Sequence, residues 1–506
     1  MKLRRKVILM LGIAGAIALT GCGETKETDE QQTADVNFEK KAEVTLGAST
    51  MIDGTGVEVL EDNIVYITEG GEYVFSGTLE EGVICVETED EVMLTLEGVT
   101  ITNSDGPAIL GVDSKAIYIN AADGSENTFS DSSTYATDEE GNDVGKGTIF
   151  SNDDLYFIGD GKITVTGNYK HTIKSDDSIF VESGILNLTA AKDGINANDI
   201  VTINGGTIVI DEAEEGIEGN TVVINGGELL VAATDDGINA ASQIQINGGN
   251  SYITCTAGDA VDSNGSLEIT GGLLVVHGSE MPEYGLDCDQ NTINITGGTI
   301  ISSGGGNSTP SDGTAAQYSI LLGSANAGDK IGILDEEGNT VFAYKSEFSY
   351  SNLLVSISGL KESATYTVYT GGTITGGTEY HGYYENATYE GGTEVTTFTT
   401  DTKVISAGGT SDMMGGGNGG PGNWGGGNRP EGGQMPENGQ MPGDGSMPEN
   451  LELPEDVQMP ENGMRPEQGE FPGGTIEQQP ETGDYGIPED GMPQMDMLQE
   501  DSETAE

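Results

Sequence analysis

The chain has 506 residues, with 19 Lys and Arg against 85 Asp and Glu, and therefore a formal net charge of −66. A field of this sign repels nucleic acid and anionic lipid and attracts cations, which excludes DNA and RNA binding. Three cysteines follow residue 22, at positions 85, 255 and 288, and these are too few for a disulfide scaffold.

Residues 1–21 have the pattern of a secretory signal, with basic residues after Met1 and an apolar stretch from Val7 to Leu19. That stretch is shorter than the roughly 20 residues that a transmembrane helix needs. The residues Leu19-Thr20-Gly21-Cys22 resemble a bacterial lipobox. We therefore expect cleavage before Cys22, acylation of its thiol, and a secreted protein that is lipid-anchored at the bacterial cell membrane or surface.

Residues 22–43 are polar and charged, which favours a flexible tether. From Val44 the sequence changes to short β-type runs, such as Ile64-Val65-Tyr66-Ile67, separated by Gly, Asp and Glu. No stretch has a helical period. We predict that residues 44–125 form an N-terminal β segment that caps one end of the following region.

Residues 126–313 contain a repeat whose clearest phrase is Asp193-Gly194-Ile195-Asn196-Ala197. Its apolar residue recurs at intervals of 21 to 25 residues, at Ile149, Ile173, Ile195, Ile217, Ile238, Val261 and Leu286. A glycine pair, first at Gly205-Gly206, follows with a similar period. Three short β runs in about 22 residues are typical of one coil of a parallel β-helix, because leucine-rich repeats need a helical half and propeller blades are about twice as long. The predicted fold is all-β, a right-handed parallel β-helix over residues 126–313.

Two residues after each apolar index residue the side chain is small, as in Ser175, Ala197 and Ala240. By strand alternation both positions point into the β-helix. We predict that residues 314–406 form a small β subdomain at the other end. Residues 407–506 are rich in Gly, Pro and Met and are predicted to be a disordered acidic tail, because a proline in every hexad prevents sheet pairing.

The positions beside the index residue carry oxygen-bearing side chains that point outward and form columns along one face. Coils are spaced about 4.8 Å apart, and two charges about 5 Å apart repel by roughly 3 kcal/mol at a dielectric of 20, so a counter-ion is favoured. Oxygen ligands without cysteine or histidine select Ca²⁺. The predicted ligand pool is Asp193, Glu215, Glu218, Asp236, Asp259, Asp262 and Asp287. The alternative is that the Asp-Gly and Asn-Gly phrases are turn chemistry, with solvated acids and ordinary Asn ladders.

The chain resembles a bacterial family of carbohydrate-binding proteins with a pectate-lyase-like right-handed parallel β-helix. The resemblance covers roughly residues 44–400 and rests on Asn103-Ser104-Asp105-Gly106-Pro107-Ala108-Ile109, Asp123-Gly124-Ser125-Glu126-Asn127-Thr128, the Asp-Gly-Ile phrases and Thr365-Tyr366-Thr367-Val368-Tyr369-Thr370-Gly371-Gly372. Characterised members bind acidic plant polysaccharide such as polygalacturonate, with cellulose also reported, and hold calcium. The resemblance implies that the protein binds an anionic glycan through bridging Ca²⁺. Separately, we expect the protein to be a monomer.

Two groups of residues are candidates for contact with the polysaccharide. One is the amide columns, and the other is an aromatic segment whose rings can stack on sugars or pack against the last coil. The candidates are Asn196, Asn198, Asn239, Asn264, Tyr380, Tyr383 and Tyr384.

We do not expect an enzyme, but two alternatives to a binding protein stay open. The first is a calcium-dependent polysaccharide lyase, in which Lys170, Lys174 or Lys192, or His171 beside the first of them, would stand near the columns. The second is a passive surface stalk or adhesin. The sequence does not separate them.

Overall fold

The computed structural model describes residues 38–137, 141–289, 292–313 and 315–408. The predicted signal peptide, Cys22, most of the tether and nearly all of the predicted tail lie outside the described residues. Within the described ranges no helix is long and apolar enough to cross a membrane. The described residues form β-strands and a single 3-10 turn, η1 (Glu61–Asn63).

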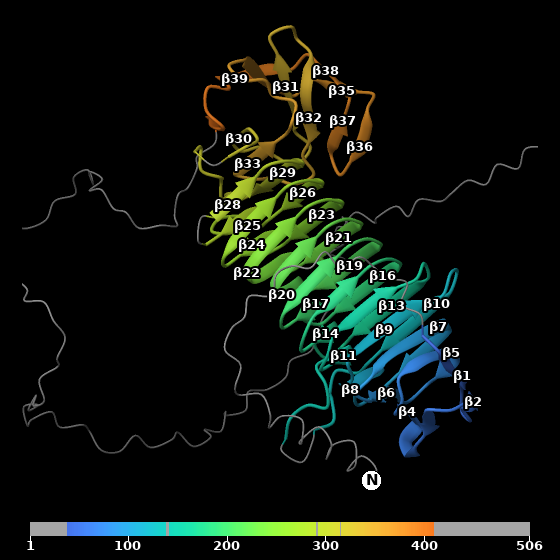
Figure 1. Cartoon of the computed structure of the whole chain (residues 1–506). Coiled ribbons are helices and arrows are strands. Elements are labelled where there is room, and N and C mark those ends of the chain that lie inside the picture. Colours follow the sequence, from blue (N-terminus) through green and yellow to red (C-terminus); the bar gives the residue numbers. More distant parts are fainter. Residues whose placement is uncertain (1–37, 138–140, 290–291, 314, 409–506) are drawn as a thin grey trace, which may run out of the picture. The chain divides into compact units, whose positions relative to one another are not determined.

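Most strands stack coil upon coil in one parallel β-helix with three faces (Figure 1). The first face consists of β4 (Ile64–Ile67), β6 (Val83–Glu87), β8 (Ile109–Asp113), β11 (Gly147–Ser151), β14 (His171–Ser175), β17 (Asp193–Ala197), β20 (Glu215–Ile224), β22 (Ile238–Ile246), β24 (Val261–Ser263) and β27 (Leu286–Cys288).

The other two faces complete each coil. The second face consists of β7 (Glu91–Thr102), β9 (Ala116–Ala121), β12 (Leu155–Ile158), β15 (Ile179–Val181), β18 (Ile200–Ile203), the ends of β20 and β22, β25 (Ser266–Ile269) and β28 (Thr292–Ile295). The start of β5 (Gly71–Leu79) lies on the second face beside the start of β7. The third face consists of the ends of β5 and β7, β10 (Glu126–Ser130), β13 (Lys162–Gly167), β16 (Ile185–Ala190), β19 (Thr207–Ala213), β21 (Glu228–Ala233), β23 (Asn250–Cys255), β26 (Leu273–His277) and β29 (Thr299–Gly304).

The parallel register confirms the predicted inward columns. Each apolar index residue pairs with the next, from Ile149 through Ile195 to Leu286, and each is fully buried. The small residues two positions on are stacked in the same way, with Ala240 between Gly219 and Ser263. This packing fits the close approach of strands in a narrow interior. The thiols of Cys85, Cys255 and Cys288 are buried and unbridged.

The glycine pairs turn the chain from the second face to the third. In every pair the second glycine, from Gly206 to Gly298, has a φ between +81° and +85°. Side chains rarely adopt this left-handed conformation, so glycine is favoured there. The first glycine lies against the preceding coil, where a Cβ on Gly205 would stand 2.7 Å from the carbonyl oxygen of Glu182. The sequence period near 22 therefore marks one turn of the β-helix.

The parallel stack begins before the boundary predicted at residue 126. Val65 pairs with Ile84, Ile84 with Ile109, and Ile109 with Ile149, so residues 64–125 contribute coils rather than only a cap. The N-terminal end is closed by β1 (Lys40–Leu46), β2 (Met51–Gly54) and β3 (Val57–Val59). β1 lies parallel to β5 and antiparallel to β2. The last residues of the expected tether thus belong to a strand.

The C-terminal end leaves the parallel pattern. β29 pairs antiparallel with β33 (Asn352–Ser356), which continues to β30 (Ser319–Leu322) and β40 (Val404–Ala407). A separate sheet has the order β36 (Thr378–Tyr380), β37 (Tyr383–Glu385), β32 (Thr340–Lys345), β31 (Lys330–Asp335), β34 (Thr365–Thr370) and β39 (Thr393–Thr399), and β35 (Thr373–Thr375) pairs with β38 (Thr388–Glu390). These strands share a second hydrophobic core, which also includes Val275 and Ile301 of the β-helix.

Candidate cation and glycan site

The first face carries the predicted acidic columns, and its local sequence explains why. In each Asp-Gly-Ile or Glu-Gly-Ile phrase the glycine passes close to the next coil. A Cβ on Gly194 would stand 2.7 Å from the carbonyl oxygen of Gly216, and one on Gly237 would stand 2.5 Å from the carbonyl oxygen of Ala260. Because the glycine permits this approach, the apolar residue turns inward, and the acids that follow it, such as Glu218 and Asp262, stay partly exposed.

Register places the side chains in two columns. One column contains Asp193 beside Glu215. The other joins, in successive coils, Lys174, Asn196, Glu218, Asn239, Asp262 and Asp287. The structure therefore confirms the alignment that was predicted from the phrase. It brings six of the seven proposed ligands into two groups of three carboxylates.

The first group, which we call triad 1, consists of Asp193, Glu215 and Glu218. One ligand oxygen from each residue lies within 4.8 Å of the others. Asn196 joins two of them, because its Nδ2 donates to Oδ2 of Asp193 at 2.6 Å and also to Glu218. Asp193 is fully buried, whereas Glu215 and Glu218 are partly exposed. Triad 1 is thus an oxygen-rich group with a buried floor and an open rim.

Triad 1 has basic neighbours. Nζ of Lys192 lies 3.2 Å from Oδ1 of Asp193. Nδ1 of His171 lies 2.9 Å from Oδ2 of the same residue, although the ring is not oriented for a linear hydrogen bond. Burial alone would raise the pKa of Asp193, but its contacts with His171, Glu218 and Asn196 hold that pKa below the usual range. The shared negative charge of the triad therefore resides mainly on Asp193.

The other two acids of triad 1 have raised pKa values because the carboxylates are crowded. Burial, followed by the charges of Asp193 and Glu218, raises the pKa of Glu215 to about 7. Burial and the interaction with Asp193 raise the pKa of Glu218 to about 7. In the absence of a cation, these two carboxyls are therefore partly protonated near neutral pH.

The second group, triad 2, consists of Asp259, Asp262 and Asp287, again with ligand oxygens within 4.8 Å of one another. Asp259 accepts a hydrogen bond from the backbone N–H of Tyr284, and Asp287 accepts bonds from the N–H of Cys288 at 2.8 Å and the hydroxyl of Ser308 at 3.0 Å. Among the described residues, no side chain or backbone group donates to the Asp262 carboxylate, and no Lys or His pairs with any member of triad 2.

The negative charge of triad 2 is therefore less compensated by positive groups than that of triad 1. Burial and the neighbouring acids raise the pKa of Asp259 to about 8, despite the hydrogen bond from Tyr284. Burial and the charges of Asp236 and Asp287 raise the pKa of Asp262 to about 7. Apart from burial, the groups that raise the pKa of Asp262 are all negatively charged. A cluster of this kind attracts cations.

The coil between the two triads has a different role. Asp236, the seventh proposed ligand, belongs to neither triad, because its Oδ1 accepts the N–H of Asp259 at 2.8 Å. Burial raises its pKa to about 6. Asn239 reaches Oε2 of Glu215 at 3.4 Å, and Asn264 reaches Oδ1 of Asn239 at 3.5 Å. These amides connect the triads along the face.

The remaining amides and lysines lie at the N-terminal end of the columns. Asn198 is exposed, donates to Asp176 at 3.2 Å and accepts from Nζ of Lys174 at 2.5 Å. Lys174 is buried, and its Nζ also donates to the Ser175 carbonyl at 2.7 Å. Burial lowers the pKa of Lys174. Lys170 lies 3.0 Å from Asp143.

The aromatic segment lies away from both triads. Tyr380 and Tyr383 are partly buried against the second core, and the His381 ring stacks on Tyr252 of β23 with centroids 3.6 Å apart. Tyr384 is only partly exposed. The structure therefore places these rings in the packing between the C-terminal sheet and the β-helix, and it does not bring them together with the acidic columns.

Sequence reasoning named His171 only as a neighbour of Lys170 and missed its contact with Asp193. The signal was present, because His171 stands two residues before Ile173, as Asp193 does before Ile195. The triads fit Ca²⁺ in donor type, since hard carboxylate oxygens with flexible spacing are its usual ligands. Three carboxylates alone leave several of its six to eight coordination positions for water or another ligand.

Comparisons with known proteins give a family model, a sequence relative and a solved structure. The family model described as "Carbohydrate-binding domain-containing protein" matches residues 61–396. A protein of the same description from Acetivibrio thermocellus is 32% identical over 190 residues, which are 37% of this chain and 65% of that protein. A solved structure described as "Structure of the polysaccharide lyase-like protein from C. thermocellum, Gadolinium derivative" is 30% identical, with a TM-score of 0.44, and the match covers 45% of this chain and 96% of that one.

Proposed function

This chain belongs to the family of carbohydrate-binding domain-containing proteins, and we propose that it binds an acidic polysaccharide at the cell surface through Ca²⁺ held by triads 1 and 2. The observation that carries the proposal is triad 2, in which three partly or fully buried carboxylates converge with no basic partner among the described residues. The lipid anchor at Cys22 belongs to the same proposal.

The negative charge of the chain means that an acidic polysaccharide needs a cation in order to bind. A chain with a formal net charge of −66 repels a polyuronate, and at about 5 Å each pair of like charges costs roughly 3 kcal/mol at a dielectric of 20. A divalent ion between a protein carboxylate and a glycan carboxylate changes this repulsion into attraction. Ca²⁺ suits this bridging role because the triad supplies only part of its coordination shell.

The spacing of the triads suits a polymer. Triad 1 spans the coils of β17 and β20, and triad 2 spans the coils of β24 and β27, with the β22 coil between them. Their centres are therefore about three coils, or roughly 14 Å, apart. An extended glycan that follows this face would meet both ions, and Asn239 and Asn264 between them offer amide donors and acceptors to its hydroxyls.

The lyase alternative needs a free base beside the metal ion. Lys174 does not meet this need, because its Nζ contacts Ser175 and Asn198 and lies 3.5 Å from Asp176. Lys192 is partly exposed but pairs with Asp193. These contacts support binding without elimination. Incubation with polygalacturonate and calcium, followed by absorbance of the unsaturated uronate product, tests for lyase activity.

The experiment measures polygalacturonate binding at increasing calcium concentration in three proteins. They are the parent chain, Glu218→Gln with Asp262→Asn, and Tyr383→Ala with Tyr384→Ala. We expect calcium-dependent binding in the parent and in the tyrosine variant. Binding should be lost or strongly weakened in the carboxylate variant, because each triad loses one charged ligand.

Calcium-independent binding that is lost only in the tyrosine variant would transfer the site to the aromatic segment. No binding of any acidic or neutral glycan by the parent would contradict the proposal and favour the stalk. Melting curves of all three proteins in chelator serve as the control for folding.

A further inference from the structure

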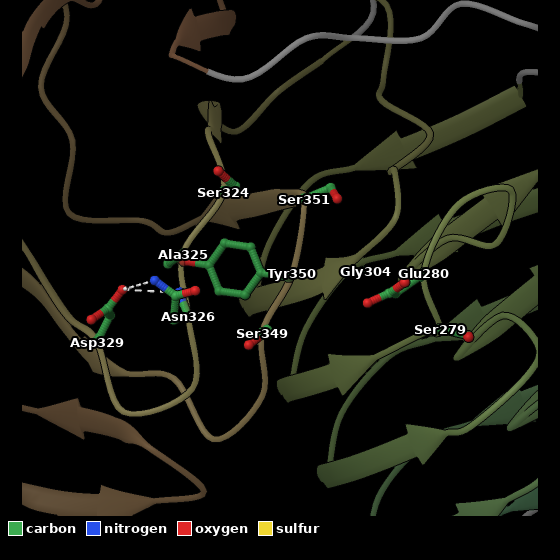
Figure 2. Close-up of a pocket in the computed structure, with 10 residues that line it drawn as sticks. All are labelled: Ser279, Glu280, Gly304, Ser324, Ala325, Asn326, Asp329, Ser349, Tyr350 and Ser351. Atoms are coloured by element: carbon green, nitrogen blue, oxygen red, sulfur yellow. Dashed lines mark hydrogen bonds between the residues drawn. The ribbon is translucent and has the colours of Figure 1, made fainter.

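A cavity of about 230 Å³ lies where the last coils of the β-helix meet the loops of the C-terminal region. Four separate segments of the chain form it: Ser279 and Glu280 after β26, Gly304 at the end of β29, residues 324–329 between β30 and β31, and residues 349–351 between β32 and β33. Figure 2 shows the Tyr350 ring in the middle of these residues. None of them belongs to the acidic columns.

Backbone hydrogen bonds hold the walls of this cavity together. Ala325 and Tyr350 exchange two N–H to carbonyl bonds, at 3.2 and 3.0 Å. The N–H of Ser351 donates to the carbonyl of Gly304 at 3.0 Å. Oδ2 of Asp329 accepts the N–H of Asn326 at 2.9 Å and its side-chain amide at 3.3 Å, as Figure 2 shows. The cavity is therefore preformed, so little ordering is needed when a ligand binds.

The rim of the cavity is polar. Glu280, Ser324 and Ser351 are exposed, and no described residue contacts their side-chain oxygens by a hydrogen bond or ion pair. Asp329 is partly exposed and has a second oxygen beyond the one bound to Asn326. These groups offer both donors and acceptors within a small space, which matches a ligand that carries several hydroxyls.

The floor is aromatic. Tyr350 is 6% exposed, and its hydroxyl is buried without a hydrogen-bond partner. Buried polar atoms normally have a partner, and among the residues that line the cavity Tyr350 has the one buried hydroxyl for which the described residues supply none. Because Tyr350 also belongs to the second hydrophobic core, its ring forms a packed apolar wall of the cavity beneath the polar rim.

Size and charge define the occupant. Cavities for drug-sized ligands measure about 300–1,000 Å³, so this cavity holds about one sugar ring. Glu280 and Asp329 place two carboxylates at the rim, without a basic residue among the lining residues. A uronate would therefore be repelled, whereas neutral hydroxyls can donate to both acids.

We propose that this cavity is a second carbohydrate site that binds one neutral sugar unit without calcium, such as a chain end or a side branch of the polysaccharide. The inference rests on the proposed function for the class of ligand, but its residues and its ion requirement are separate from those of the triads. The two sites together would let the chain recognise a glycan that has both charged and neutral parts.

The test is saturation-transfer NMR in chelator with D-glucose, D-galactose, D-mannose, D-xylose and D-galacturonate as probes. The proteins are the parent, Ser324→Leu, which narrows the cavity, and Glu280→Gln, which removes an exposed acceptor. Matched controls are Thr375→Leu and Glu336→Gln, both at exposed positions outside the cavity.

We expect the parent to bind at least one neutral sugar, and to bind galactose more tightly than galacturonate. Ser324→Leu should weaken binding by at least about tenfold, because a filled cavity excludes the ring. Glu280→Gln should weaken binding of the neutral sugar by about tenfold. It should also reduce the ratio of the affinity for galactose to the affinity for galacturonate. The control variants should bind as the parent does.

Absence of signal for every neutral probe would overturn the inference, and so would binding that Ser324→Leu leaves unchanged or that requires calcium. The proposed function would survive each of these results if the parent still bound polygalacturonate with calcium. If the parent gave the neutral-sugar signal but did not bind polygalacturonate with calcium, the proposed function would fail and the second site would stand.

Discussion

At the scale of single residues, the two triads differ in what surrounds them rather than in their own chemistry. Asp193 has Lys192, His171 and Asn196 close by, and its pKa is held low. The charged groups that act on Asp262 are all other acids, and its pKa is raised to about 7. We infer that triad 2 depends more strongly on a cation than triad 1, because nothing else in the described part of the chain neutralises it.

The first prediction concerns pH. The raised pKa values of Asp259, at about 8, and of Asp262, Glu215 and Glu218, at about 7, mean that the folded chain binds protons that the unfolded chain has lost. Calcium-free stability should therefore fall as pH rises from about 6.5 to 8.5, the range that contains these raised values. Burial lowers the pKa of the partly buried His277 to about 4. This shift makes stability rise with pH only below the usual pKa of histidine, so the chosen window avoids its effect.

Calcium should reverse the loss, because it competes with protons for the same carboxylates. Differential scanning fluorimetry with calcium or chelator should show a rise in melting temperature that grows from pH 6.5 to pH 8.5. An equal rise at both ends of the window would count against the triads as the binding groups.

The second prediction isolates triad 2. In chelator at pH 8, Asp262→Asn should melt at the same temperature as the parent or higher, because the change removes like-charge repulsion from a carboxylate to which no described residue donates. The same variant should lose most of the calcium-induced rise in melting temperature. Asp211→Asn, at an exposed position outside the triads, is the matched control and should respond to calcium as the parent does.

At the scale of elements, the repeat predicted the strands well because one physical constraint sets the spacing. Each coil must return to the same register, so the index residue, the small residue and the glycine pair recur together. The N-terminal coils were missed as coils because their spacing is irregular. Val65 to Ile84 is 19 residues, Ile84 to Ile109 is 25 and Ile109 to Ile149 is 40, and no Asp-Gly-Ile phrase marks them.

The third prediction tests the inward column. Ala240 is fully buried between Gly219 and Ser263, so Ala240→Phe should overpack the interior and lower the free energy of unfolding by about 1 to 3 kcal/mol. The neighbouring Ala241 is exposed, and Ala241→Phe should have little effect. Chemical denaturation of both variants gives the comparison, and equal midpoints would show that the column does not have this register.

The candidate site was only partly predictable from the sequence. Strand alternation placed the acids on one face, but it did not indicate which of them converge. Asp236 occupies the same phrase position as Asp193, yet its carboxylate binds a backbone N–H of the next coil. No repeat in the sequence predicts the cavity around Tyr350, because three unrelated loops and the end of β29 form it. Such sites depend on tertiary contacts that a linear pattern does not contain.

At the scale of the whole molecule, the formal net charge of −66 determines what the protein can approach. An anionic polymer is repelled unless cations lie between the two, and salt screens only part of this field. We propose that the lipid anchor and the calcium-dependent glycan binding act together, so that the chain holds polysaccharide at the cell surface.

The fourth prediction concerns the anchor, which lies outside the described residues. Cys22→Ala removes the thiol that we expect to be acylated, so the protein should move from the membrane fraction to the soluble fraction of the producing cells. Immunoblots of both fractions provide the measurement. Continued retention of the variant in the membrane fraction would refute the lipobox assignment.

The most direct test of the central claim is the calcium affinity of the parent chain, measured by isothermal titration with and without an oligogalacturonate. If Ca²⁺ bridges protein and glycan, each must raise the affinity for the other by the same factor. We predict that the oligogalacturonate tightens calcium binding, and that this effect disappears in the variant with Glu218→Gln and Asp262→Asn. A calcium affinity that is the same with and without the oligosaccharide would contradict the account.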